Sequence, residues 1–197
     1  MTGMDKLKNL IEEHDGIISS KLVEENNIHR EYLRQMVLNG ELERAARGVY
    51  ILPEVLEDEM LILQLKNTRI IYSHESALLL HDLTDRVPFQ HVATVPYGYN
   101  PTRLKAEGLL VHTVKKDLID VGICSKKTIF GNEVKTYDVE RTICDIFKDR
   151  NNQDIEIVLD ALKRYFRRKD RDLNKLMKYA ELLKIKNILM PYLRALI

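Results

Sequence analysis

Apolar and polar residues follow a helical period, and then a strand-like one, over residues 16–52. Leu22 and Val23 form the apolar side of a short helix that Ser19 or Ser20 begins, because a hydroxyl accepts hydrogen bonds from the free amides of a first turn. The two asparagines after this helix favour a turn, since their side chains compete with the helical backbone. The pattern therefore predicts a short helix followed by a tight turn.

A second helix is predicted from about residue 29 to residue 39. Gly40 ends it, because glycine readily adopts the left-handed conformation of a C-terminal cap. Residues 41–52 then alternate as two strands around a tight turn, with arginines near its tip. The buried stripe of the second helix is expected to consist of Leu33, Met36 and Val37.

Two short helices followed by a hairpin are the layout of a winged helix-turn-helix DNA reader. In such a reader the second helix enters the major groove, where arginine suits guanine and glutamine suits adenine. Arginines of the hairpin, or wing, meet phosphates or a narrow minor groove, and the start of the first short helix can hold a phosphate. The predicted DNA contacts are Ser19, Ser20, Lys21, His29, Arg30, Arg34, Gln35, Arg44 and Arg47.

Residues 1–52 carry slightly more acidic than basic side chains, which is unusual for a domain that binds DNA without sequence preference. Binding must then depend on the position of a few arginines and should respond strongly to salt. A small helical module that contacts a protein has the same shape, with its arginines simply solvated, and this alternative stays open.

The composition changes after residue 54, where the hairpin ends. Residues 55–66 have the pattern of a helix, with acidic residues between apolar ones. We therefore expect a connecting helical segment between two domains. The predicted limits are 1–54 for the winged helix-turn-helix domain, 55–69 for the connection and 70–197 for the C-terminal domain.

The C-terminal domain mixes strand-like and helical patterns. Helices are expected after Ser73, Asp138, Asp154 and Asp172 and from about Asn187, with Ile155 and Leu173 among the inward-facing residues. Strands are expected at 91–96 and 109–114, followed by a hairpin at 128–130 and 133–137. The predicted fold class is α+β: an N-terminal winged helix-turn-helix domain and a C-terminal domain with a small sheet and a helical C-terminal end.

The composition places the chain among soluble intracellular proteins. It has 197 residues, a formal net charge of +1 and 45% hydrophobic residues, enough for one large domain or two small ones. No signal-peptide pattern and no apolar run long enough for a bilayer is present, so a cytoplasmic location without membrane contact is expected. The two cysteines, Cys124 and Cys144, match no metal-ligand spacing.

Most motifs that suggest catalysis are incomplete. His74-Glu75 begins like a zinc-protease helix, but Leu78 stands where the second ligand belongs. Asp120, Glu133 and Lys135 resemble the metal-binding core of restriction-type nucleases, a triplet that is common by chance in a chain rich in Glu and Lys. We therefore expect no enzyme activity, no cofactor and no metal, with a metal-dependent nuclease as an alternative.

A basic segment runs from the end of one predicted helix into the next, and only a few acidic residues oppose it. It could contact the DNA backbone or a partner. Bases at the C-terminal end of a helix also simply complement its dipole. The residues concerned are Lys163, Arg164, Arg167, Arg168, Lys169, Arg171, Lys175 and Lys178.

Three blocks in this order resemble the AbiEi antitoxins of bacterial abortive-infection (AbiE) systems, which are type IV toxin–antitoxin pairs. They are Gly40-Glu41-Leu42-Glu43-Arg44-Ala45-Ala46-Arg47-Gly48-Val49-Tyr50, Tyr72-Ser73-His74-Glu75-Ser76-Ala77-Leu78 and Val139-Glu140-Arg141-Thr142-Ile143-Cys144-Asp145. The blocks span nearly all of the sequence, and their order is more specific than any one of them.

The resemblance implies two activities. The N-terminal domain would repress its own operon by binding inverted repeats in the promoter as double-stranded DNA, with a monomer in solution and two copies on the operator. The C-terminal domain would neutralise a nucleotidyltransferase-type toxin, without a stable complex. A one-component regulator whose C-terminal domain senses a ligand remains the alternative of a different class.

Overall fold

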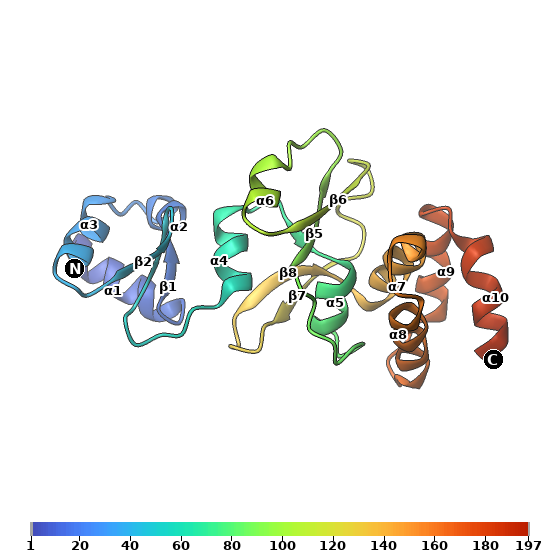
Figure 1. The fold of residues 1–197 in the computed structure, drawn as a ribbon. Helices are drawn as coiled ribbons and strands as arrows, with labels where there is room; N and C mark the ends of the chain where they lie inside the picture. Colours follow the sequence, from blue (N-terminus) through green and yellow to red (C-terminus); the bar gives the residue numbers. More distant parts are fainter. Residues whose placement is uncertain (1, 197) are drawn as a thin grey trace. The chain divides into compact units, whose positions relative to one another are not determined.

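The computed structural model describes residues 2–196, with the side chains of residues 2–195, and divides them into two compact units (Figure 1). The first unit extends to Thr68 and includes Lys127–Glu133. The second unit comprises Arg69–Lys126 and resumes at Val134. Each unit is described by itself below, and the domain limits 1–54, 55–69 and 70–197 remain a sequence-based prediction.

The first unit contains a helix-turn-helix and a three-stranded antiparallel sheet in the order β1-β3-β2. The prediction of two short helices and a hairpin is confirmed. The third strand, β1, was not predicted, because a three-residue apolar strand shows no alternation. The elements are α1 (Gly3–Glu13), β1 (Ile17–Ser19), α2 (Ser20–Glu25), α3 (Glu31–Leu38), β2 (Glu43–Ala46), β3 (Val49–Ile51) and α4 (Glu59–Lys66).

Two apolar clusters hold this unit together. The first lies between α1, α2 and α3, where Leu7, Val23 and Leu33 are fully or almost fully buried. The second joins α4 to the sheet by packing Ile62 against Ile17 and other sheet residues. Because α4 shares a core with the wing strands, it belongs to the first unit.

Asp58 fixes where α4 begins. Its Oδ1 accepts a hydrogen bond from the Leu61 amide at 3.2 Å, and its Oδ2 accepts from the Thr128 hydroxyl at 2.5 Å and the Asn132 amide group at 2.9 Å. The side chain is almost fully buried. The helix therefore starts at Glu59, later than the predicted residue 55.

The second unit has a five-stranded mixed sheet in the order β6-β5-β4-β8-β7 and a helical C-terminal end, so the α+β prediction is confirmed. Strands β4 and β5 are antiparallel, whereas β4–β8 and β5–β6 are parallel. The elements are β4 (Ile71–Tyr72), α5 (His74–Leu80), β5 (Val92–Pro96), α6 (Thr102–Ala106), β6 (Leu110–Val114), β7 (Ile123–Lys127), β8 (Glu133–Tyr137), α7 (Val139–Lys148), a 3₁₀ turn (Arg150–Asn152), α8 (Ile155–Arg167), α9 (Leu173–Leu182) and α10 (Lys186–Leu196).

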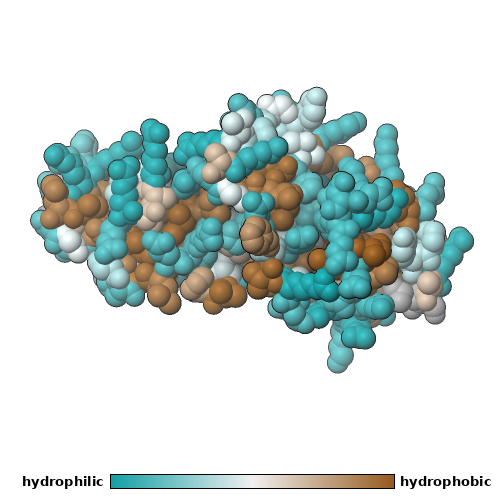
Figure 2. All heavy atoms as spheres, in the orientation of Figure 1, coloured by the Kyte–Doolittle hydropathy of each residue, from teal (hydrophilic) through white to brown (hydrophobic). Residues whose placement is uncertain are grey.

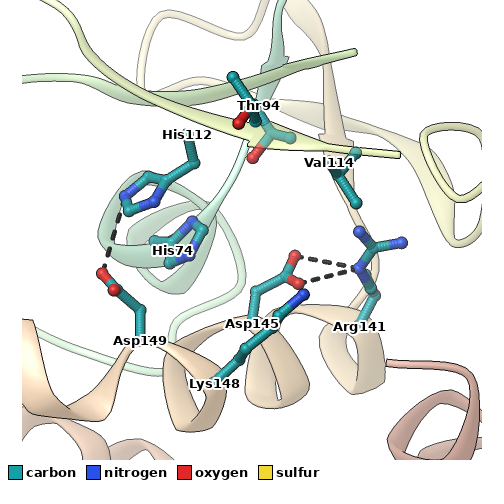
Figure 3. A pocket seen from close by; sticks show the side chains of 9 residues that line it. His74, Thr94, His112, Val114, Arg141, Asp145, Lys148 and Asp149 are labelled. Atoms are coloured by element: carbon teal, nitrogen blue, oxygen red, sulfur yellow. Dashed lines mark hydrogen bonds and ion pairs between the residues drawn. The ribbon is translucent and has the colours of Figure 1, made fainter. Parts of the chain in front are cut away.

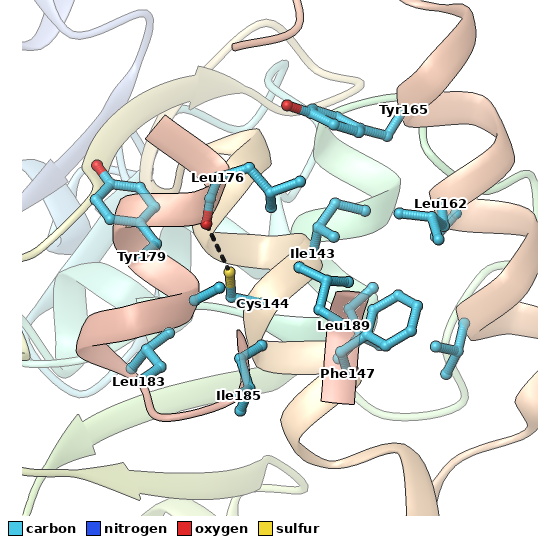
Figure 4. Packing of buried hydrophobic residues seen from close by; sticks show 14 of the residues in the cluster. Ile143, Cys144, Phe147, Leu162, Tyr165, Leu176, Tyr179, Leu183, Ile185 and Leu189 are labelled. Atoms are coloured by element: carbon cyan, nitrogen blue, oxygen red, sulfur yellow. Dashed lines mark hydrogen bonds between the residues drawn. The ribbon is translucent and has the colours of Figure 1, made fainter. Parts of the chain in front are cut away.

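Helix α7 is buried from Glu140 to Phe147 and forms the centre of the helical end. Its apolar side chains pack against residues of α5, α8, α9 and α10, and Figure 4 shows this cluster around Cys144 and Phe147. Asp138 caps the helix by accepting from the Arg141 amide, as the sequence predicted. No described helix is both long and apolar enough to cross a membrane.

Three sequence-based details are wrong. The predicted strand at 128–130 is a turn, because Thr128 and Asn132 pair across it and Thr128 is held by Asp58; β7 ends at Lys127. Ile155 and Leu173 were expected to face inward but are 45% and 36% exposed. Each is the first residue of its helix, where the chain lies outside the packed core.

The surface carries scattered apolar side chains among hydrophilic ones, and the face drawn in Figure 2 shows this mixture. Single exposed apolar residues are normal on folded proteins and need no functional explanation. The most exposed of them are Leu38, Leu56, Val87, Phe89, Tyr97 and Ile129.

Candidate functional site

The start of α2 lies beside the wing turn. The Ser20 amide donates to the Gly48 carbonyl at 2.8 Å, and Gly48 has φ +75°, a conformation that suits glycine. A Cβ at this position would also come within 3.0 Å of the Ser20 hydroxyl. This contact brings Ser20 and the wing arginines, predicted separately from the sequence, to one part of the unit.

The three residues predicted to contact DNA at the start of α2 differ in how far their side chains are exposed to solvent. Ser19 is 7% exposed, and its hydroxyl accepts from the Leu22 amide at 3.2 Å as the helix cap. Ser20 is half-buried. Lys21 is exposed, with its Nζ 3.6 Å from a carboxylate oxygen of Glu25. The Ser19 side chain is therefore used inside the fold, while Lys21 reaches solvent.

The outer face of α3 carries the expected polar residues. His29, Arg30, Arg34 and Gln35 are all exposed, whereas Leu33 of the predicted stripe is buried. The helix begins at Glu31, two residues later than predicted. The His29 Nδ1 accepts from the Glu31 amide at 3.2 Å.

Both arginines on this face have acidic neighbours. An Arg30 Nη2 donates to Glu24 at 2.6 Å, and an Arg34 Nη1 donates to Glu31 at 3.3 Å. All four side chains are solvent-exposed, so these ion pairs contribute little to stability. Both guanidinium groups can therefore exchange a carboxylate for another anion.

The wing arginines are different. Arg44 on β2 and Arg47 at the turn are exposed, and within residues 2–195 neither side chain makes a hydrogen bond or ion pair. Their charges are available to an external anion such as a phosphate. The wing thus offers two arginines without a partner among the described residues, and α3 offers two arginines whose exposed ion pairs an external anion could replace.

This part of the chain has known relatives. Residues 5–53, from α1 through β3, match the family model described as "Transcriptional regulator, AbiEi antitoxin". The N-terminal region is therefore similar to AbiEi antitoxin-type transcriptional regulators. This AbiEi-type domain contains all nine DNA contacts predicted for the winged helix-turn-helix, but not the basic segment at residues 163–178.

A solved structure also aligns with most of the chain. The crystal structure of the RV2827C protein from Mycobacterium tuberculosis aligns over 98% of this chain and 81% of its own, with 12% sequence identity and a TM-score of 0.48. A search of curated proteins gave no match.

The basic segment of α8 and α9 is partly neutralised within the second unit. Arg164 donates to Asp85 and Asp160, Arg168 donates to Asp170, and Lys175 lies 2.9 Å from Asp138. Arg171 donates to the Arg168 carbonyl. Of the predicted cations, those that are exposed and make no such contact within the described residues are Lys163, Arg167, Lys169 and Lys178.

A cavity of about 210 Å³ in the second unit was not anticipated (Figure 3). His74, at the start of α5, stacks on His112 of β6 with ring centroids 3.8 Å apart. Asp149, the residue after α7, has a carboxylate oxygen 3.8 Å from the His112 Nε2. Burial lowers the pKa of both histidines, and the neighbouring His112 lowers that of His74 further.

The floor of this cavity contains a buried ion pair. The Arg141 Nε donates to both carboxylate oxygens of Asp145 at 3.0 and 3.1 Å, and its Nη1 donates to the carbonyls of Leu118 and Val121. The guanidinium also lies 4.2 Å from the centre of the Tyr137 ring. Two residues four apart on a helix are at an ordinary salt-bridge spacing, and the sequence alone does not show that this pair is buried.

The metal-ligating residues that lie together in the structure are not those of the nuclease alternative. Within residues 2–195, one group of three or more metal-ligating side chains comes together, and it consists of His74, His112 and Asp149. Asp120 and Glu133 are not part of it. The sequence missed this group because its members are far apart in the chain and follow no ligand spacing.

Proposed function

We propose that this protein is a sequence-specific DNA-binding autorepressor and an antitoxin that binds inverted repeats in its own promoter. The observation that carries the proposal is the AbiEi-type domain at residues 5–53, with exposed cationic side chains on both its α3 face and its wing. A protein-contact module would not need basic side chains on both elements that a winged helix presents to DNA.

We expect the exposed groups to contact different parts of the DNA. The α3 face, with Arg34 and Gln35, enters the major groove and reads base edges. Arg44 and Arg47 contact phosphates or a narrow minor groove. Lys21 contacts the backbone near the start of α2. Because Arg30 and Arg34 begin in pairs with glutamates, they reach DNA by exchanging one anion for another.

The assembly follows the symmetry of an inverted repeat. One copy binds each half-site, so two copies occupy the operator while the free protein is a monomer. Size-exclusion chromatography with light scattering would show a monomer alone and two copies per DNA duplex. A single half-site should then bind one copy.

The antitoxin activity belongs to the second unit and opposes a nucleotidyltransferase-type toxin in the cytoplasm, without a stable complex. The family description of the first unit as an antitoxin regulator supports it. The unpaired cations Lys163, Arg167, Lys169 and Lys178 are the first residues to vary. Growth rescue by a variant that no longer binds DNA would separate this activity from repression.

The test of the repressor activity is fluorescence anisotropy on a labelled fragment from upstream of the gene, against a scrambled fragment, at several salt concentrations. Arg34→Ala should reduce the preference for the native fragment. Arg47→Ala should weaken binding to both fragments and lower the salt slope by about 0.9 for each phosphate that the protein no longer neutralises. Lys6→Ala, an exposed base on α1, is the matched control and should change neither. Equal binding to both fragments by the wild type would refute the proposal.

A second candidate function has one observation in its favour. The cavity beside His74 is lined by several ionisable groups that could bind a charged ligand, which suits a ligand-sensing regulator. An effect of a bound ligand on operator affinity would distinguish this function from simple repression.

A further inference from the structure

Three side chains that bind transition metals meet in the second unit, outside the DNA-binding domain. His74 comes from the start of α5, His112 from β6 and Asp149 from the end of α7. One ligand atom from each lies within 4.8 Å of the other two. Figure 3 shows the three side chains turned toward one another at the edge of the cavity.

Each side chain has a ligand atom free for a metal. The His74 Nδ1 lies 3.0 Å from the Ser73 hydroxyl, which also accepts from the Thr94 hydroxyl at 2.8 Å. When Nδ1 donates to Ser73, the Nε2 lone pair of His74 is left for coordination, the usual arrangement of a metal-bound histidine. Asp149 accepts from Asn152 through Oδ1 and keeps Oδ2 toward His112.

Ring stacking accounts for the contact between His74 and His112, but not for the position of Asp149 or the backbone of His74. The 3.8 Å between His112 Nε2 and Asp149 Oδ2 is too long for a hydrogen bond. His74 has φ +49°, a left-handed conformation that is uncommon for a residue with a side chain and that is often found at functional sites. The fold therefore holds His74 in a costly conformation that places its ring against His112.

The spacing is that of a slightly open site. Two ligands of a tetrahedral zinc ion lie about 3.3 Å apart, since each bond is about 2.0–2.1 Å long. Separations of up to 4.8 Å require the ligand atoms to approach by up to about 1.5 Å. The stacked His74 and His112 rings, now 16° from parallel, must also tilt, because a bound metal lies near the plane of each imidazole.

We propose that His74, His112 and Asp149 bind one divalent transition-metal ion, with Zn²⁺ as the best match. Two imidazoles and one carboxylate are the ligand set of open zinc sites, in which a fourth position takes water or an external ligand. That position faces the cavity of about 210 Å³, where Lys148 favours an anionic fourth ligand. The site is independent of the proposed DNA binding, because no residue of the AbiEi-type domain takes part.

The experiment uses the full chain, stripped with a chelator and titrated with Zn²⁺ by calorimetry and with Co²⁺ by visible absorption. The wild type should bind one ion and give the intense visible bands of tetrahedral cobalt. His112→Gln and Asp149→Asn, at half-buried positions, should each weaken binding about tenfold or more. His14→Gln, at an exposed histidine outside the site, is the matched control and should bind like the wild type.

The variants must be shown to fold by circular dichroism, and Zn²⁺ should raise the melting temperature of the wild type and the control but not of the two site variants. Equal zinc affinity in the wild type and in both site variants would overturn the proposal. A thiolate-to-cobalt charge-transfer band would also overturn it, because it would assign the ion to Cys124 or Cys144.

Discussion

Replacing Arg141 by methionine tests whether the buried ion pair of α7 organises the second unit. Arg141 is 1% exposed and Asp145 is 6% exposed. The substitution keeps most of the aliphatic stem but leaves the Asp145 carboxylate buried without its cation. It also removes the donor to the Leu118 and Val121 carbonyls, which hold the loop before β7.

The expected loss is large. Breaking a buried pair by removing one partner costs about 3–5 kcal/mol. Each of the two carbonyls that loses its donor adds about 1 kcal/mol. The free energy of unfolding should therefore fall by about 5–7 kcal/mol, and the melting temperature by about 10–25 °C for a chain of this size.

A second substitution separates the pair from the packing around it. In Arg141→Met with Asp145→Leu, no buried charge remains uncompensated, so most of the loss should be recovered. Urea unfolding at pH 7.5, followed by circular dichroism and tyrosine fluorescence, measures both variants. A loss below about 1 kcal/mol in the single variant, or an equal loss in both, would refute this reasoning.

The same pair predicts a pH dependence. Burial raises the pKa of Asp145 from its usual 3.8 to about 6, although Arg141 opposes the shift. Between these values the folded protein holds a proton that the unfolded chain has lost, so this group's contribution to stability falls as the pH rises from 3.8 to about 6. Comparing Asp145→Asn with the wild type at pH 4.5 and pH 7.5 isolates that contribution from those of other groups, including Lys148 and Asp138. An identical pH profile in both proteins would contradict the shift.

Three further predictions concern DNA binding and the cysteines. Glu24→Gln should free Arg30 and remove a negative charge near the DNA, so operator affinity should rise severalfold in the anisotropy assay; unchanged affinity would show that Arg30 does not reach DNA. Arg47→Ala should reduce the salt slope by about 0.9, whereas a wild-type slope would exclude a phosphate contact. Maleimide should label Cys124 first in the folded protein, because Cys144 is fully buried and burial raises the pKa of its thiol further; rapid double labelling would argue against this packing.

Local signals made much of the fold predictable. The Asp138 cap, the Gly40 stop and the turn before α3 depend on neighbouring residues, so the sequence alone locates them to within a few positions. Strand β1 and the true end of β7 depend on distant partners. Ile17 becomes a strand residue only because Ile51 lies opposite it, and Thr128 leaves the strand because Asp58 binds its hydroxyl.

The candidate sites, too, could be predicted from the sequence where they depend on local spacing but not where they depend on distant residues. The exposed face of α3 follows from helical spacing, so its polar residues could be named in advance. The sequence could not show which of these charges are paired, because the pairs of Arg30 with Glu24 and of Arg34 with Glu31 depend on side-chain geometry. His112 had no signal at all, since its neighbours at the cavity come from other elements that the sheet brings together.

The order of strands in the second unit determines when each strand can pair with its neighbours during synthesis. Strand β4 has only two residues and lies between β5 and β8, and its Tyr72 pairs with Thr136. During synthesis β5 follows β4 soon after, but β8 is added only when about two thirds of the chain has been made. Until then the backbone N–H and C=O groups along one edge of β4 have no strand partner and can pair with strands of other chains. Nascent chains halted before Thr136 should therefore be the ones that depend most on chaperones.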